Sequence, residues 1–350
     1  MKRKLILAFV CMFIMVSAIG CGSNNSENLD SKKGEPTAAA TPTVVPTKVP
    51  TQAPTQTPTP TVAPTKIPTQ VPATKAPATK KPAVKPANIK LGSSWKQIHS
   101  EEYKYEFYAA GFNNKKQGVT VGYAGEIHYT KDGAKKWNNA NNSSACLFGL
   151  DFATDQVVYT CGNQGNVTKS TDGGEFFELV APFGDSEPEQ CQVMSFCDEN
   201  NGIIASDKRM AKTSDGGKTW TEITIPSNIV AIYMTAPDTF YFMDTSFSIN
   251  KTSDGGTTWE TTPTNLKGNY FTGIKSAALY VDAENAFTIF CTDMNLRELK
   301  SFSTIDNWGK IKENKVPKVK GVLYFYINHK GDTLTISNLN EKKIVILGKK

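Results

Sequence analysis

Aspartates in presumed loops after residue 150 are the residues that could carry catalysis in this chain. Hydrolysis of a glycosidic bond needs two carboxyl groups held roughly 5 to 9 Å apart, one acting as acid and the other as base or nucleophile. Five aspartates are candidates for such a pair: Asp151, Asp185, Asp207, Asp244 and Asp293. No spacing links any two of them, and acidic loop residues are mostly solvated surface groups. The sequence therefore assigns no catalytic residue.

Histidines and nucleophile motifs give no stronger signal. The three histidines, His99, His128 and His329, lie far apart and lack the spacing of metal ligands. The chain contains neither a GxSxG elbow nor a phosphate-binding loop. We expect no metal and no cofactor.

The cysteines after Cys21 are odd in number: Cys146, Cys161, Cys191, Cys197 and Cys291. Cys191 and Cys197 fall on one presumed strand, about 20 Å apart, which is too far for a disulfide. Cys146 and Cys161 fall on presumed partner strands and could pair only if the register allows it. Buried free thiols are the default expectation.

The N-terminus has the pattern of an export signal. Lys2, Arg3 and Lys4 precede an apolar run over residues 5–19, too short for a membrane span. Residues 1–20 are therefore expected to be a signal peptide. The small residues before Cys21 resemble the lipobox of bacterial lipoproteins, which implies that Cys21 is lipidated, for example with palmitate, and begins the mature protein. An ordinary cleaved signal peptide is the alternative.

A linker follows the polar N-terminal segment 21–36. Residues 37–90 consist mainly of Pro, Thr, Ala, Val and Lys, a composition that forms no packed core. Prolines at this density favour an extended chain, which at about 3.1 Å per residue would reach at most roughly 170 Å. We expect a disordered stalk whose lysines keep it soluble and could contact anionic cell-wall polymers.

The stalk and the signal also account for the positive net charge of the chain. The net charge is +6, but the stalk holds seven lysines and no acidic residue, and the signal adds three basic residues. The remaining segment, 91–350, is slightly acidic. A nucleic-acid partner is therefore not expected.

Internal repetition sets the architecture of residues 91–350. The nonamer KTSDGGKTW at 212–220 returns as KTSDGGTTW at 251–259, and related stretches end at Trp137 and Phe177. The closing aromatics recur about every 40 residues, and short alternating runs lie between them. A period near 40 with four strands per unit is typical of β-propeller blades.

The repeats resemble the Asp-box, or BNR repeat, of sialidase-like propellers: Ser or Thr, then Asp, Gly and an aromatic at fixed spacing. The resemblance implies an all-β propeller of four-stranded antiparallel blades. A worn copy, Thr130, Asp132 and Trp137, has Ala134 in place of the second glycine, so its turn could be distorted. The other copies are Ser170, Asp172, Gly174 and Phe177; Thr213, Asp215, Gly217 and Trp220; and Thr252, Asp254, Gly256 and Trp259.

The chemistry of the box favours a structural role. A short Asp side chain can accept hydrogen bonds from the N–H groups of a hairpin turn, and glycine adopts the positive φ that the turn requires. The aromatic ring can fill the space between neighbouring blades. Since the Asp residues are one blade apart around a ring, they cannot converge on a substrate.

The period predicts six blades, with seven as the alternative. Trp308 is expected to close a degenerate fifth unit, and the sixth unit ends before a closing Trp. Trp95 lies one period before Trp137, so we expect an N-terminal strand to complete the last blade and close the ring.

The resemblance does not extend to sialidase activity. Sialidases hold the substrate carboxylate with three arginines, whereas only Arg209 and Arg297 follow the signal here. Other Asp-box propellers, such as the photosystem assembly factor and the sortilin receptors, bind proteins without catalysis. Propellers usually bind ligands at the loops between strands two and three and between blades, which here hold Tyr123, Gln164, Lys208, Arg209 and Phe247. We expect a lipid-anchored module on the bacterial cell surface that binds protein or glycan, with a polysaccharide hydrolase as the alternative.

Overall fold

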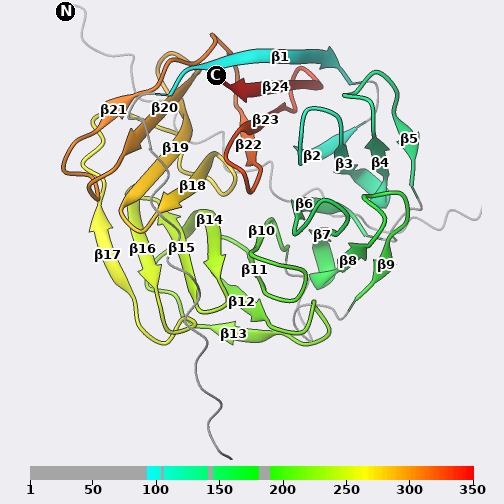
Figure 1. The fold of residues 1–350 in the computed structure, drawn as a ribbon, viewed down its shortest axis with the longest axis horizontal. Coiled ribbons are helices and arrows are strands. Elements are labelled where there is room, and N and C mark those ends of the chain that lie inside the picture. The colour runs from blue at the N-terminus through cyan, green and yellow to red at the C-terminus, as the bar shows by residue number, and fades with distance from the viewer. Residues whose placement is uncertain (1–92, 104–105, 141–144, 181–189) are drawn as a thin grey trace, which may run out of the picture. The chain divides into compact units, whose positions relative to one another are not determined.

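A computed structural model describes residues 93–103, 106–140, 145–180 and 190–350. These residues form six four-stranded antiparallel sheets arranged as blades around a central axis (Figure 1). The predicted all-β propeller with six blades is therefore confirmed. The proposed signal, lipid-attachment and stalk segments, and Asp185, lie outside the described residues.

The strands follow the chain order within each of the first five blades. Blade 1 has β2 Phe107–Phe112, β3 Gly118–Gly122, β4 Ile127–Thr130 and β5 Asn138–Asn139. Blade 2 has β6 Leu147–Phe152, β7 Val158–Gly162, β8 Val167–Ser170 and β9 Glu178–Leu179. Blade 3 has β10 Val193–Phe196, β11 Gly202–Ala205, β12 Met210–Thr213 and β13 Thr221–Ile223. In each blade the first strand is innermost.

Blade 4 has β14 Ile229–Ala236, β15 Thr239–Asp244, β16 Ser248–Thr252 and β17 Glu260–Pro263. Blade 5 has β18 Ala277–Ala283, β19 Ala286–Asp293, β20 Glu298–Thr304 and β21 Lys312–Glu313. Blade 6 has β22 Tyr324–Ile327, β23 Thr333–Asn338, β24 Lys343–Lys349 and, as its outer strand, β1 Trp95–Glu102. The described residues contain two short 3₁₀ helices, η1 Tyr123–Gly125 and η2 Asn163–Gly165. No helix among these residues is long and apolar enough to span a membrane.

The first and last strands of the chain close the ring, as predicted from Trp95. β1 pairs antiparallel with β24 from Trp95 opposite Lys349 to Glu102 opposite Lys343, with one irregularity near Ile98 (Figure 1). The buried Trp95 ring packs edge-on against Phe290 of blade 5 at 5.0 Å between centroids. β1 therefore completes blade 6 and also covers the side of its neighbour.

Hydrogen bonds beyond the ladder fix the start of β1. Trp95 donates its N–H to the carbonyl of Lys315 in blade 5 (2.8 Å), and Lys315 donates its own N–H to the carbonyl of Ser93 (3.0 Å). On the other side, the N–H of Lys350 bonds the carbonyl of Ser94 (2.8 Å). The first described residues are thus held by two blades at once.

The Asp-box forms a tight hydrogen-bonded turn between the third and fourth strands. In blade 3, Thr213 Oγ1 donates to Asp215 Oδ1 (2.8 Å) and accepts the N–H of Gly217 (2.9 Å), while Asp215 Oδ1 also accepts the N–H of Thr219 (3.0 Å). Gly216 donates its N–H to the carbonyl of Asn200 (2.9 Å), which belongs to the inner hairpin turn of the same blade. The box thus joins the outer hairpin of a blade to its inner hairpin.

The worn copy in blade 1 keeps this geometry. Ala134 adopts φ +69° in place of the second glycine and still donates its N–H to Thr130 Oγ1 (3.1 Å). Asp132 Oδ1 accepts the N–H of Lys136 at 3.0 Å. The expected distortion of this turn does not occur, because the small Ala134 side chain is buried among the apolar side chains of blades 1 and 6.

Blade 5 carries a fifth Asp-box, and it corrects the role predicted for Trp308. Thr304 Oγ1 donates to Asp306 Oδ1 (2.9 Å) and accepts the N–H of Trp308 (3.0 Å), as Thr213 accepts that of Gly217. Trp308 therefore stands in the turn, with φ +72°, instead of at the closing position, which Ile311 occupies. Its ring still fills the space beside blade 4 by stacking on Phe287 at 5.8 Å.

The closing aromatics fill the spaces between blades, as predicted. Trp259 packs edge-on against Phe242 of its own blade at 5.0 Å and donates Nε1–H to the carbonyl of Thr224 in blade 3 (3.0 Å). Trp137 lies against Tyr103 at 5.2 Å and donates to Glu101 of β1 (2.8 Å). Each ring thus joins its blade to the preceding one.

Lysines before the box make a second connection between blades. Lys212 Nζ donates to Asp238 Oδ1 (2.6 Å), and Lys251 Nζ to Glu284 Oε1 (3.0 Å). Both acids lie on the inner hairpin turn of the following blade. Because these acids are exposed, the ion pairs add little stability individually and mainly favour the correct neighbour.

Deleting residues 91–100 should destabilise the ring far more than deleting residues 37–85. The first deletion removes most of β1 and exposes both the edge of β24 and the Phe290 side chain. We expect aggregation or a melting temperature many degrees lower, measured without the signal segment, while the second deletion matches the parent. Equal melting of the two truncated chains would show that β1 is dispensable for closure.

Asp215→Ala should lower the melting temperature by roughly 2 to 6 °C at pH 7, because turn N–H groups lose their acceptor. The Thr219 hydroxyl and N–H hold the pKa of Asp215 at about 2. Since this folded-state pKa lies below the ordinary 3.8, the stabilisation is present above pH 4 and is lost as the pH falls through about 2. The difference from the parent should therefore shrink between about pH 4 and pH 2 in thermal scans.

Asp254→Ala should behave in the same way, whereas Glu178→Ala, on the exposed strand β9, serves as the control and should melt like the parent. A normal melting temperature for both Asp variants would contradict a structural role for the box.

Candidate ligand-binding site

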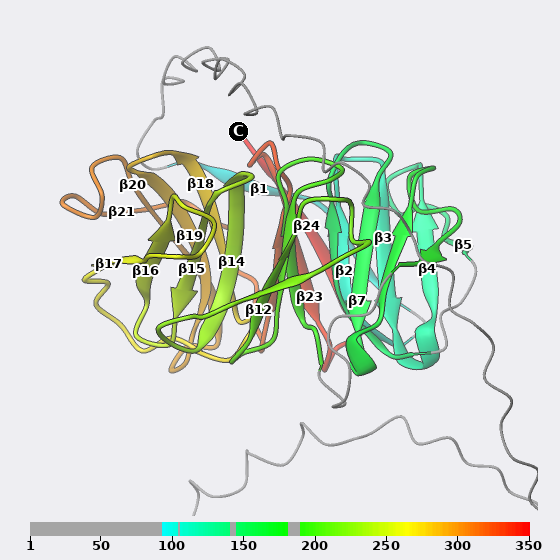
Figure 2. The same cartoon turned by 90° about the horizontal axis from the view of Figure 1, so that it is seen from below.

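The topology gives the ring two different faces. One face carries the turns between the first and second strands together with the Asp-boxes, and the other carries the turns between the second and third strands together with the connections between blades. Figure 2 shows the ring from the side, with strands running between these faces. We call the second one the connection face. It is the face on which the sequence predicts a ligand.

A hollow of about 790 Å³ lies in the connection face at the mouth of the central channel. Its walls come from the starts of the inner strands and from the connections before them. Aromatic side chains from three blades, Tyr108, Phe148 and Tyr324, share it with the amides of Gln190, Gln192 and Asn228. Tyr108 and Phe148 lie beside each other, with centroids 5.1 Å apart and planes tilted by 39°. The hollow thus combines apolar rings with amide donors and acceptors.

Strand irregularities place these aromatic residues. Tyr108 and Phe148 occupy equivalent positions in β2 and β6, where the pairing with the second strand skips one residue. A bulge residue leaves the ladder, so its carbonyl needs another donor. Both carbonyls therefore face the channel mouth.

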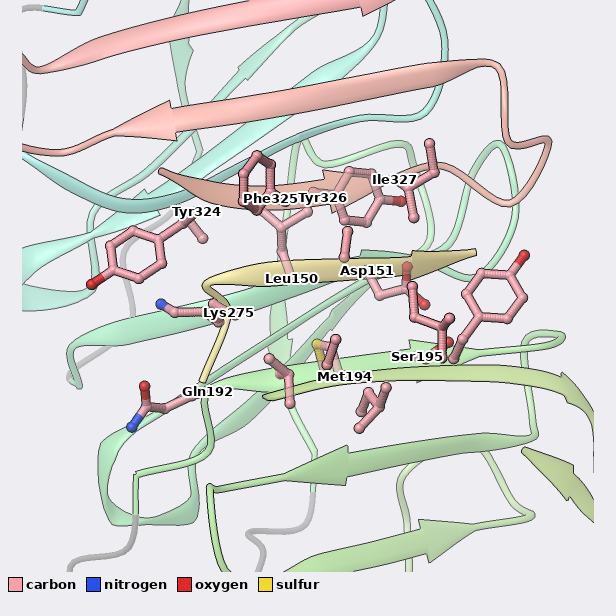
Figure 3. Close-up of a pocket in the computed structure, with 18 of the residues that line it drawn as sticks. Leu150, Asp151, Gln192, Met194, Ser195, Lys275, Tyr324, Phe325, Tyr326 and Ile327 are labelled. Atoms are coloured by element: carbon pink, nitrogen blue, oxygen red, sulfur yellow. The ribbon is translucent and has the colours of Figure 1, made fainter. Parts of the chain in front are cut away.

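Lys275 supplies that donor. Its Nζ donates to the carbonyl of Phe148 (2.8 Å) and to that of Tyr108 (3.4 Å), and it lies over the Tyr324 ring at 5.2 Å (Figure 3). Its backbone N–H bonds the carbonyl of Val230, another bulge residue (2.9 Å). Desolvation lowers the pKa of Lys275 to about 8. The side chain lines both the hollow and the channel below it.

The channel narrows beneath Lys275 and becomes polar again near its far end. Figure 3 shows Tyr324, Lys275 and Gln192 at one end, and Asp151, Ser195 and Tyr326 toward the other. The buried Asp151 Oδ2 accepts the N–H of Phe196 in blade 3 (2.6 Å) and lies 3.4 Å from His329 Nε2 of blade 6. A single carboxylate thus connects three blades.

Electrostatics suit this carboxylate to a structural role. Burial alone would lower the pKa of His329, but the Asp151 carboxylate outweighs burial, so the pKa lies above its ordinary value. The Tyr326 hydroxyl accepts the N–H of Phe152 (3.2 Å), and burial raises its pKa strongly. The Asp151 and His329 side chains therefore form an ion pair that spans the channel when the histidine is protonated.

The five residues predicted to bind a ligand do not form one site. Tyr123 and Gln164 are exposed on η1 and η2 of adjacent blades, and Lys208 borders the hollow. Arg209 is held by Glu222 through two hydrogen bonds of 2.7 and 3.2 Å. Phe247 is buried and packs on Tyr270 at 5.3 Å, so this residue is a core residue and the prediction of a ligand contact is wrong for it.

Two of the candidate acids accept hydrogen bonds from the backbone N–H groups of turns. Asp244 Oδ1 accepts the N–H groups of Ser246 and Ser248, both at 2.9 Å. Asp293 Oδ1 accepts the N–H groups of Asn295 and Leu296. Asp151 is buried in the channel, and among the described residues that line the hollow Asp207 is the one carboxylate. The four candidate acids that the structure describes therefore do not supply, in this hollow, the facing pair that glycoside hydrolysis needs.

The prediction missed the aromatic residues of the hollow, although a signal for two of them exists. FYAAGF at 107–112 and LFGLDF at 147–152 align with a spacing of 40, which places Tyr108 and Phe148 at the same position of successive blades. No local signal marks Lys275, since its function depends on carbonyls from two other blades. Within the residues that the structure describes, no cluster of His, Cys, Asp or Glu is suited to a metal ion.

One family of known sequences matches part of the chain. A sequence model of the family described as "Photosynthesis system II assembly factor YCF48" matches residues 140–278. A comparison with curated proteins gives no match.

Three solved structures are similar to this chain at low sequence identity. "YCF48 bound to D1 peptide" is 13% identical, with a TM-score of 0.45, over 76% of this chain and 98% of that chain. "YCF48 from Cyanidioschyzon merolae" is 14% identical, with a TM-score of 0.47, over 73% and 98%. The WD40 propeller domain of Doa1 is 10% identical, with a TM-score of 0.49, over 74% and 98%.

The family match covers the three complete Asp-boxes that begin at Ser170, Thr213 and Thr252. Together with the six blades and the hydrogen-bonded box turns, the match shows an Asp-box propeller that is similar to this family over residues 140–278.

Proposed function

We propose that this chain is a lipid-anchored, extracytoplasmic propeller that binds a protein partner in the hollow of the connection face without catalysis. The observation that carries the proposal is the composition of that hollow. Tyr108, Phe148 and Tyr324 present ring faces beside amides, which suits recognition of a peptide segment through apolar contact and hydrogen bonds.

The electrostatics of the hollow also favour a largely uncharged ligand segment. The ammonium group of Lys275 is directed at two carbonyls and at the Tyr324 ring, so it is engaged within the ring. Asp207 and Lys208 border the hollow with opposite charges. A strongly acidic or basic ligand would gain little there, whereas apolar and amide groups would find partners.

Hydrolysis of a polysaccharide is the less favoured function. It would require two carboxyl groups facing a substrate, and the described lining of the hollow offers Asp207 alone. The match to an assembly-factor family also supports a binding role.

The N-terminal sequence supports a tether for this module. Cys21 follows an export-type signal, and lipidation there would hold the chain on the outer surface of a membrane. The proline-rich stalk, residues 37–90, would separate the propeller from that surface and could contact anionic wall polymers through its lysines.

A photo-reactive phenylalanine analogue placed at Tyr324 should cross-link a discrete protein partner in intact producing cells. The same group at Phe176, which is 53% exposed beside the Asp-box of blade 2, is the matched control and should give no such adduct. Adducts are measured by gel shift and mass spectrometry. Adding Tyr108→Ala and Phe148→Ala should reduce the Tyr324 adduct at least roughly tenfold, because two ring faces are lost.

Three results would contradict the protein-binding proposal. One is equal cross-linking from Tyr324 and Phe176, and another is an adduct that resists protease but is removed by glycosidases. The third is release of reducing ends from a polysaccharide by the purified chain, abolished by Asp207→Asn, which would favour the hydrolase instead.

Cys21→Ser should release the folded protein from the membrane fraction, because Cys21 is the proposed attachment site. The measurement is fractionation of cells and medium, with the melting temperature as a check on folding. Membrane association that persists in this variant would indicate another tether.

A further inference from the structure

Two free thiols lie together between blades 2 and 3. Cys161 is on β7, and Cys191 lies in the connection two residues before β10. Both side chains have no measurable exposure and belong to the same apolar cluster, together with Met194 and Phe196 of blade 3. They are therefore shielded from water by the same set of residues.

Backbone geometry brings the two residues into register. Cys191 donates its N–H to the carbonyl of Gly162 at 3.0 Å, which places it beside the residue that follows Cys161. A Cβ atom on Gly149 would lie 3.0 Å from Cys161 Sγ and 2.6 Å from the carbonyl oxygen of Gln192. The sulfur of Cys161 and the segment after Cys191 thus converge on one point, where Gly149 leaves space.

The electrostatic neighbours are consistent with this contact. Burial raises the pKa of Cys191 strongly, and the Cys161 thiol raises it further, while the Lys275 ammonium acts in the opposite direction. Desolvation lowers the pKa of Lys275, and both thiols act on this pKa in the opposite direction. Because burial disfavours the thiolate that disulfide exchange requires, we expect the exchange to occur as the chain folds, before the two thiols are shielded from water.

Other pairings are less favourable. Cys291 is buried in blade 5, and the Cys197 thiol contacts Asp198 and Asn201 at the far end of β10. Cys161 is a free thiol in the structure, so the pairing with Cys146 considered from the sequence is not formed.

We propose that Cys161 and Cys191 form a disulfide bond when the chain matures in an oxidising compartment, a setting that rests on the proposed export. The two thiols lose two protons and two electrons to a small-molecule or protein disulfide, which is reduced to two thiols as the new S–S bond forms. The bond joins blade 2 to the end of the connection that carries Gln192 into the hollow. It therefore fixes one wall of the ligand site covalently.

Peptide mapping tests the bond directly. The purified full chain is refolded in the presence of glutathione disulfide, denatured, alkylated at free thiols and digested without reductant. We expect a cross-linked peptide pair that contains Cys161 and Cys191, and full alkylation of Cys291. Alkylation of both Cys161 and Cys191, or a bond between Cys161 and Cys146, would overturn the inference.

Mapping the chain isolated from its producing cells separates this inference from the proposed location. A bond in both samples supports both ideas. A bond that forms only with added glutathione disulfide supports the pairing but contradicts maturation outside the cytoplasm. Absence of the bond in both samples overturns the pairing and leaves the ligand-binding proposal to its own cross-linking test.

Thermal unfolding gives an independent measure. Reduction should lower the melting temperature of the oxidised parent by roughly 5 to 10 °C, because a cross-link over this chain length constrains the unfolded state. Cys161→Ala and Cys191→Ala should each remove the sensitivity to reductant. Cys291→Ala, which also deletes a buried thiol, should keep it. Sensitivity that survives in the Cys161→Ala variant would contradict the bond.

Discussion

Closure of the ring through β1 and β24 is the constraint on which the other contacts of this propeller depend. A closed ring has no free side, so every blade is covered by a neighbour on both flanks. The inner strands then meet at one axis, and only this convergence brings Tyr108, Phe148 and Tyr324 from blades 1, 2 and 6 into one hollow. The ligand site is therefore a property of the complete ring and of no single blade.

Within this constraint the Asp-box solves a local problem. Blades 1 to 5 end in a short outer strand, for example two residues in β5, β9 and β21. The hydroxyl, carboxylate and N–H groups of the box hold that outer strand to the inner hairpin of its own blade. The aromatic ring after the box then joins the blade to its predecessor. The box residues and the aromatic therefore stabilise each blade internally and against its neighbour, from the face opposite the hollow.

The features that could be predicted from the sequence are those that repeat locally. Asp215 and Asp254 mark box turns because the hydrogen-bonding groups lie within a few residues, and Trp95 completes the period. Trp308 was assigned to the wrong position because the register of a box is set by its hydroxyl and carboxylate, whereas the aromatic can move. The loop position of Phe247 predicts a surface residue, but its ring is buried against Tyr270.

The ligand site was harder to predict because its parts are distant in sequence. Lys275 bonds carbonyls of residues 108 and 148, which belong to blades opposite its own connection. The contact between Cys161 and Cys191 likewise depends on the packing of two blades. Such contacts depend on the dimensions of the whole ring. A repeat period near 40 predicts the number of blades but not the distances between residues across the ring.

The attachment of the chain at β1 has a mechanical consequence. Any pulling force transmitted through the residues before Ser93 reaches the propeller at the strand that closes it. The load would first meet the hydrogen bonds that join Ser93, Ser94 and Trp95 to Lys315 and Lys350, and only then the ladder with β24. Because these bonds come from two blades, tension is shared across a blade boundary before the closing strand can peel away. A tethered propeller built in this way would resist shear from its surroundings at the point where a ring is otherwise weakest.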